Sequence, residues 1–225
     1  MDALYTEWTR RWQAAVDACE RMGSFRTDMV IGPPASSNAV SEMEVALGQP
    51  LPASFRKVLL DFSAEVEIRW FLADGIYPPE PCPQITYGGY AWSLSRMTEI
   101  AHWYQAWLKV FDINDPYNRI WYGKLAFMEV GNGDNIAFNP EHAQDAPVIY
   151  LSHDGGDAHG YCLGKNFVDF IERHSLLGFA GPAGWNLMPF LPDAMSGLDA
   201  YGENSQKWRE WFGLDFEAKS HDNDD

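Results

Sequence analysis

Apolar residues recur along the chain with two different periods, which predict helices in some segments and strands in others. Spacings of three and four residues place side chains on one face of a helix. Such a face opens the chain, where it is formed by Trp8, Trp12, Ala15, Val16, Cys19 and Met22 and ends at Gly23. Strict alternation of apolar and polar residues over 65–72 predicts a strand with one buried face.

Residues 41–63 predict two helices joined by a tight corner. Met43 and Leu47 mark a short helix that stops at Gly48, and a second helical face follows after Pro50 and Pro52. The prolines prevent the intervening backbone from staying helical. The second face consists of Phe55, Val58, Leu59 and Phe62. A linker over residues 31–38 is expected before this unit.

The middle of the chain predicts short strands close together in sequence. A strand over 85–94 precedes a helix whose apolar face carries Met97, Ile100, Trp103, Tyr104 and Trp107. A hairpin is expected to pair 125–130 with 135–138, because the intervening Gly-Asn-Gly-Asp tolerates positive φ. Another strand is predicted over 147–152, followed by a loop over 153–160.

The C-terminal part predicts two further helices. Asn166 has the character of an N-cap, and the helix after it carries Phe167, Phe170, Ile171, His174 and Leu177. A last short helix carries Trp208, Trp211 and Phe212 and is expected to end before Gly213. Strands and helices do not alternate in the parallel pattern. We therefore predict a single α+β domain over residues 1–214, with helices packed on one twisted, mostly antiparallel sheet.

Composition and charge narrow the classes of partner. Of 225 residues 46% are hydrophobic and 15% aromatic, which is ample for a core. The net charge is −16. The last eleven residues hold five acids and one lysine, so they carry −4 and the rest keeps −12. Such a surplus repels nucleic acid and anionic membranes and attracts basic partners. Composition alone is equally explained by an acidic surface that merely keeps the protein soluble. Residues 215–225 are expected to form an acidic, disordered tail.

Three cysteines, no long apolar run and no signal-like N-terminus favour a cytoplasmic protein. The cysteines at positions 19, 82 and 162 have neither paired nor metal-type spacing, so reduced thiols are expected. No segment approaches the roughly 18 apolar residues of a membrane span.

Residues 153–159, His-Asp-Gly-Gly-Asp-Ala-His, are the strongest candidate in the sequence for a metal-binding or catalytic site. Two imidazoles and two carboxylates within seven residues suit a transition metal. However, the spacing is not helical, and the two glycines do not preorganise ligands. We therefore expect no metal, no cofactor and no catalytic residue, and a connecting loop whose polar side chains cap backbone groups or face solvent.

Two ordered sets of motifs resemble the SUKH superfamily, in its Smi/Knr branch. The first is the helix ending at Leu47-Gly48, the Leu51-Pro52 corner and the helix over 54–62. The second is the Gly-Asn-Gly-Asp turn at 131–134, the strand with Val-Ile-Tyr at 148–150, a polar turn and an aromatic-rich helix from 167. Their order agrees over residues 41–177, although 63–65 read Ser-Ala-Glu where the family often has Asn-Gly-Gly.

The resemblance implies an α+β fold and a binding role instead of catalysis. Bacterial relatives include immunity proteins that neutralise polymorphic toxins, often nucleases, and eukaryotic relatives act as scaffolds in cell-wall assembly. We therefore predict an immunity-type protein that binds a basic toxin. The alternatives are a scaffold or regulatory binder with another client and, as a different class, a metal-dependent enzyme that uses residues 153–159.

Three turn-rich segments combine acidic and aromatic residues and are the predicted partner-binding surface. Their candidate residues are Asp112, Asp115, Trp121, Asp134, Asn135, His153, Asp154, Asp157 and His159. Trp121 and Trp185 are the two tryptophans that are candidates for an exposed interface anchor, although aromatic residues in loops more often pin the loop to the body of the protein. Changing Asp134, Asp154 and Asp157 to Lys is expected to weaken binding at least about tenfold, with little effect on stability, if these carboxylates are exposed.

Overall fold

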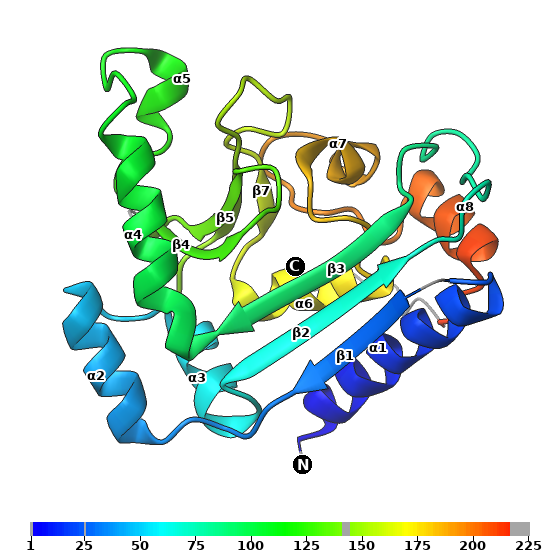
Figure 1. The fold of residues 1–225 in the computed structure, drawn as a ribbon, viewed down its shortest axis with the longest axis horizontal. Helices are drawn as coiled ribbons and strands as arrows, with labels where there is room; N and C mark the ends of the chain where they lie inside the picture. Colours follow the sequence, from blue (N-terminus) through cyan, green and yellow to red (C-terminus); the bar gives the residue numbers. More distant parts are fainter. Residues whose placement is uncertain (1, 25, 141–144, 217–225) are drawn as a thin grey trace, which may run out of the picture.

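The computed structural model describes residues 2–24, 26–140 and 145–216 (Figure 1). The expected helices and strands appear in the predicted order, and the structure adds strands over 26–31 and 162–164 and short helices over 116–119 and 184–187. The elements are α1 (Ala3–Arg21), β1 (Arg26–Ile31), α2 (Ser37–Leu47), α3 (Ala53–Asp61), β2 (Glu65–Phe71), β3 (Tyr87–Ser93), η1 (Leu94–Arg96), α4 (Met97–Leu108), α5 (Pro116–Arg119), β4 (Leu125–Glu129), β5 (Asn135–Phe138), β6 (Val148–Leu151), β7 (Cys162–Gly164), α6 (Phe167–Leu176), α7 (Gly184–Leu187), η3 (Met188–Phe190) and α8 (Glu203–Phe212).

The helix ends follow the side chains that predict them. Gly48 and Gly213 adopt left-handed conformations, with φ of 70° and 75°, and so end α2 and α8. The side chain of Asn166 accepts a hydrogen bond from the backbone N–H of Asp169 and caps α6. α2 already begins at Ser37, inside the expected linker, because Ser36 caps its first turn.

The strands form two antiparallel sheets, so the α+β prediction is confirmed, but the strands divide where one sheet was expected. Three strands pair in the order β1-β2-β3 and four in the order β4-β5-β6-β7. The edge of β3 is partly occupied by the segment after α6, since Gly89 N–H donates to the carbonyl of Phe179 and Gly181 N–H donates to that of Tyr87. These bonds use backbone groups that a continuous sheet would offer to β4.

The buried side chains of helices and sheets join in one large cluster. It extends from Tyr5 on α1 to Phe216 beyond α8. Trp12 shows how the elements meet, because its ring lies edge-on to Phe62, Trp92 and Phe179. The flanking helices α1 and α8 therefore contribute to the same core as the strands, with α6 behind the three-stranded sheet (Figure 1).

Phe216 corrects the predicted boundary of the tail. Only 8% of this residue is exposed, and Arg10 lies over its ring at 5.5 Å from the centroid. Its apolar ring thus belongs to the core, although it follows the last helix. Residues 217–225, the remainder of the expected tail, lie outside the described part of the chain.

A second, smaller cluster places α4 on the outer face of the four-stranded sheet. Ile100 and Tyr104 pack there with Trp121 and with side chains from the strands. Trp103, expected on the same apolar face, is 53% exposed. Adjacent helical residues are separated by about 100°, so Trp103 turns away from the sheet that Tyr104 covers. Over the described residues, every helix is too short or too polar to span a membrane.

Candidate functional site

The β4–β5 turn and the β6–β7 loop meet at the carboxylate of Asp134. One oxygen of this carboxylate accepts hydrogen bonds from the backbone N–H and the Nδ1–H of His153, at 2.9 and 2.7 Å. The other accepts from the Tyr150 hydroxyl at 2.5 Å and from the Asn132 amide at 2.7 Å. The structure thus brings together the two segments that the sequence could not place on one side of the sheet.

The charge of Asp134 is held by these donors. Burial acts to raise its pKa, but the hydrogen bonds from Tyr150, His153 and Asn132 together outweigh burial and hold the pKa below its ordinary value. Burial and the neighbouring carboxylate raise the pKa of Tyr150, whose hydroxyl in turn accepts a hydrogen bond from the backbone N–H of Gly184. Asp134 therefore links three segments and α7 in one network.

His159 has a structural role that also fixes its tautomer. Its Nδ1 accepts a hydrogen bond from the backbone N–H of Ser152, and its Nε2 lies 2.9 Å from the carbonyl oxygen of Tyr117. Because a carbonyl only accepts, Nε2 carries the proton and the ring is neutral. Burial lowers the pKa of His159, which favours the same neutral form. Both nitrogens are therefore already in use.

Trp121, Asp134 and Asn135 are buried, which corrects the expectation that they are exposed partner contacts. Trp121 is 0% exposed, and its indole N–H donates to the carbonyl of Ser152 beneath the loop. Asp134 and Asn135 are each 2% exposed. The condition for the expected neutrality of the triple Lys substitution is therefore not met at Asp134, where a lysine would bury a cation and disrupt the network.

Asp112, Asp115, Asp154 and Asp157 are exposed, as expected, but they lie in two places. Asp115 caps α5 by accepting from the backbone N–H of Tyr117, and Asp112 accepts from that of Asn114. Asp154 and Asp157 lie in the β6–β7 loop. His153 is half-buried, with its ring against Trp107 at 4.8 Å between centroids.

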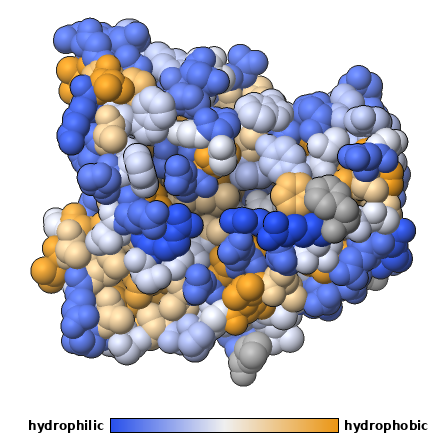
Figure 2. All heavy atoms as spheres, in the orientation of Figure 1, coloured by the Kyte–Doolittle hydropathy of each residue, from blue (hydrophilic) through white to orange (hydrophobic). Residues whose placement is uncertain are grey.

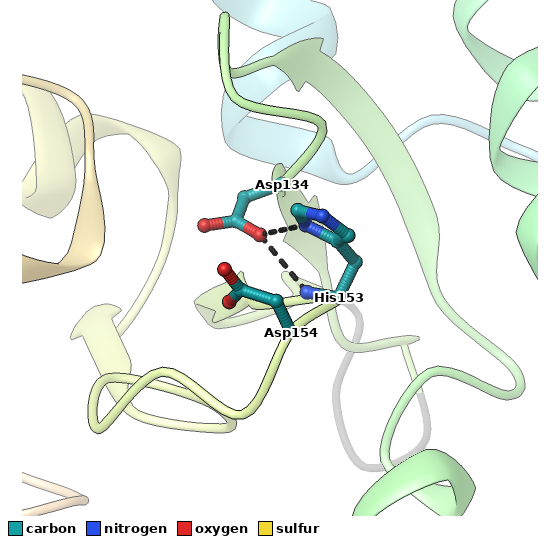
Figure 3. Close-up of side chains that lie close together, drawn as sticks. All are labelled: Asp134, His153 and Asp154. Carbon is teal, nitrogen blue, oxygen red and sulfur yellow. Dashed lines mark hydrogen bonds and ion pairs between the residues drawn. The ribbon is translucent and has the colours of Figure 1, made fainter.

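Asp134, His153 and Asp154 offer three atoms that are suitable as metal ligands, all within 4.8 Å of one another. Figure 3 shows the two carboxylates turned toward each other and the imidazole beside Asp134. This is not the expected pair of histidines, because His159 is engaged elsewhere. Both oxygens of Asp134 and Nδ1 of His153 already form hydrogen bonds. A cation at this position would have to compete with those bonds.

Neither imidazole of the loop is hydrogen-bonded to a serine hydroxyl or cysteine thiol in the described part of the chain. The hydroxyl of Ser152 donates to Asp154 at 2.9 Å, and no hydrogen bond joins it to either imidazole among those the structure describes. Burial raises the pKa of the Cys162 thiol, which disfavours the reactive thiolate. The described residues of the loop therefore form no Ser–His or Cys–His pair of the kind used in acyl transfer.

A recess of about 460 Å³ separates the β6–β7 loop from α7. Carboxylates line one side, from Asp134, Asp154 and Asp157, and Trp185 and Met188 line the other. Trp185, a candidate anchor, is 48% exposed. The described residues that line the recess include no lysine, arginine or histidine. We call this surface the acidic recess.

Sequence reasoning missed the contact between α7 and the loop. Trp185 was a candidate anchor, but nothing in the order of residues places it beside Asp154 and Asp157. Gly184 and Met188 were not candidates at all. The only local signal was the run of Gly, Pro and Asn around Trp185, which predicts irregular backbone without showing what that backbone contacts.

Comparison with known proteins agrees with this architecture. Among curated proteins no match is found. The model of the SMI1 / KNR4 family (SUKH-1) matches residues 34–173, from the segment before α2 into α6, and so includes both sheets except β1. Because the match spans more than half of the chain, the protein belongs to the SMI1 / KNR4 (SUKH-1) family.

Proposed function

We propose that this protein is an immunity-type binder that neutralises a basic, nuclease-like toxin through the acidic recess. Family membership supports a protein-binding role of the immunity or Smi/Knr type. The observation that carries the choice of surface is the convergence of Asp154 and Asp157 with the exposed ring of Trp185. Charge steers a basic partner to the surface, and a rigid aromatic side chain provides affinity once the partner has docked.

The acidic recess combines a fixed frame with exposed contact groups. Ser152 and Asp134 hold the loop from below through hydrogen bonds, so little conformational freedom is lost when a partner binds. Asp154 and Asp157 lie above that frame and are exposed. A toxin that grips nucleic acid carries lysine and arginine where it binds phosphate, and the recess is complementary to such a surface.

In this role the chain carries out no catalysis, holds no cofactor and acts in the cytoplasm. The three free cysteines support a reducing environment, and burial raises the pKa of Cys82 to about 11, so its thiol stays protonated.

A scaffold or regulatory role with a non-toxin client remains the alternative, since the same recess would serve it. One equivalent of bound metal that is lost in His153→Ala would instead favour the metal-dependent enzyme.

Co-expression with the product of the gene immediately upstream tests the proposal. We expect the two proteins to form a complex and the toxicity of the neighbour to disappear. Asp154→Lys with Asp157→Lys should weaken the complex at least about tenfold. Trp185→Ala should weaken binding by about 1–2 kcal/mol of binding free energy.

The matched control reverses two exposed acids away from the recess, Asp74→Lys on the β2–β3 connection and Glu210→Lys on α8. It changes the net charge equally but should alter affinity less than about threefold. Equal losses in both double variants would indicate attraction by net charge alone. Absence of both complex formation and growth rescue would contradict the immunity role.

A further inference from the structure

A separate groove runs beside α2 and is lined mainly by apolar residues. It measures about 590 Å³. One wall is a single face of α2 that consists of Ala39, Met43 and Ala46, spaced by four and three residues. The opposite wall comes from the segment before α2 and from Ala64 and Leu94 near the ends of β2 and β3. Hydrophobic atoms gather over α2, at the lower left in Figure 2.

Backbone hydrogen bonds preform the walls of this α2 groove. Ala35 N–H donates to the carbonyl of Leu59, and Ala64 N–H donates to that of Pro33, both within 2.9 Å. Leu94 N–H donates to the carbonyl of Ala64 and ties the end of β3 to the same segment. The segment before α2 is therefore fixed to α3 and β2, and the groove does not depend on a flexible linker.

The groove is open because its walls carry small side chains. Four alanines and two prolines stand where larger residues would fill the space between α2 and the sheet. Among the residues of α2 that the structure describes, Val40 alone is fully buried, so the helix leaves much of its apolar face uncovered. Apolar area left open in this way gains free energy when a partner covers it, at about 25 cal/mol per Å².

The rim of the groove selects the kind of occupant. Glu42 and Glu65 are exposed there, and no basic residue is among its described lining. A second copy of this chain would present the same acidic rim and a net charge of −16, so self-association brings like charges together. A segment that carries lysine or arginine beside its apolar residues is instead complementary in both charge and hydropathy.

We infer that the α2 groove binds an apolar side chain, flanked by lysine or arginine, from a helical segment of the protein partner. The apolar side chain lies between α2 and Leu94, while its basic neighbours reach Glu42 and Glu65 at the rim. This mode combines helix-in-groove recognition with electrostatic selection. It rests on the proposed function only in that the partner is a basic protein, and it adds a contact surface separate from the acidic recess.

The probe is a fluorescently labelled helical peptide with leucine at every third or fourth position and lysine elsewhere. Its dissociation constant is measured by anisotropy against the full chain. Ala39→Leu fills the groove and should weaken binding at least about fivefold, as should Ala46→Leu at a more exposed position of the same wall. Ser41→Leu adds the same side chain to an exposed position of α2 that does not line the groove, and should change the constant less than about twofold.

Further probes separate the contributions of charge and shape. A peptide with glutamate for lysine should not bind measurably, and one with serine for leucine should bind at least about fivefold more weakly. Equal effects of Ala39→Leu, Ala46→Leu and Ser41→Leu would overturn the inference. So would a dimer, seen by sedimentation, that Ala39→Leu dissociates, because the occupant would then be a second copy.

The loop variant distinguishes this inference from the proposed function. Asp154→Lys with Asp157→Lys should leave peptide affinity within about threefold of the wild type, since neither residue lines the groove. Loss of peptide binding in that variant would assign the peptide to the acidic recess and contradict the inference. The peptide assay does not involve the toxin. Its result can therefore be interpreted even if the neutralisation experiment fails.

Discussion

At the scale of single residues, the same chemistry has different roles according to burial. Asp134 and Asp154 are both aspartates next to a glycine-rich turn, and both take part in hydrogen bonds with residues of the β6–β7 loop. Asp134 is buried and accepts four hydrogen bonds, so it organises the site. Asp154 is exposed and keeps its charge available to a partner.

Asp134→Asn should destabilise the fold by about 2–4 kcal/mol, because an amide cannot accept all four hydrogen bonds that the carboxylate accepts. The folded pKa of Asp134 lies below the unfolded value of 3.8, so its charge stabilises the fold above that pH. The difference between wild type and variant should therefore shrink as the pH falls below 3.8. Urea unfolding at several pH values measures both effects. Asp154→Asn is the control and should stay within about 0.5 kcal/mol.

His174 should make stability fall in acid. It is fully buried, its Nε2–H donates to the carbonyl of Ala180, and its Nδ1 has no hydrogen-bond partner. Burial lowers its pKa from 6.5 to about 4. The unfolded chain therefore binds the proton more readily, and the free energy of unfolding decreases as the pH falls from 6.5 to about 4.

The loss attributable to His174 should reach about 3 kcal/mol at the acid end of that window. His174→Phe removes the titrating group from the cluster of Phe170, Tyr90 and Phe179 and should flatten the pH dependence, whatever its effect at neutral pH. Unfolding curves of variant and wild type with the same slope between these pH values would refute the assignment.

At the scale of elements, the segments outside the family match complete the core. α1 contributes Trp8 and Trp12, and the segment after α8 contributes Leu214 and Phe216. α1 is also joined to α6 by polar contacts, since Glu172 accepts from the Trp8 indole at 2.5 Å and pairs with Arg11 at 2.7 Å. These flanks cover apolar surface that the matched region by itself would expose.

Phe216→Ala should lower the free energy of unfolding by about 1–3 kcal/mol, because the ring is buried against the core. Removal of residues 219–225 should leave the melting temperature essentially unchanged, since their sequence contains no apolar residue to bury. Thermal unfolding of the two variants compares these effects. A fall of several degrees on truncation would show that the acidic end docks on the body.

At the scale of the whole molecule, the net charge and the concave surfaces act at different distances from a partner. The net charge of −16 attracts basic proteins from a distance, while the acidic recess and the α2 groove offer short-range contacts. The long-range part depends on ionic strength, because the Debye length falls from about 30 Å at 0.01 M to about 10 Å at 0.1 M salt.

Association with the partner should therefore slow as salt increases, and dissociation should change little. The rate of the wild-type protein should fall more steeply with salt than that of Asp154→Lys with Asp157→Lys, because the variant has lost local attraction. Stopped-flow mixing at low and moderate ionic strength measures both slopes. Parallel slopes would place the steering charge elsewhere on the surface.

The order of most helices and strands follows from the sequence alone. So does the prediction of an antiparallel sheet, because strands and helices do not alternate along the chain as they do in parallel sheets. Alternation over residues 65–72 predicts β2, the apolar spacing after Asn166 predicts α6, and Gly48 and Gly213 end their helices as expected. These features depend on side-chain period and backbone conformation, which short segments determine by themselves. The same reasoning missed β1, whose residues show no regular alternation of burial.

The tertiary structure decided which polar and aromatic residues are available to a partner. Trp121 and Trp185 both lie in irregular segments, yet Trp121 is buried beneath the β6–β7 loop and Trp185 is exposed on α7. Asp134 is buried because Tyr150, Asn132 and His153 meet it from a strand, a turn and a loop. Whether a side chain is buried depends on contacts between segments distant in sequence, and no local period records those contacts.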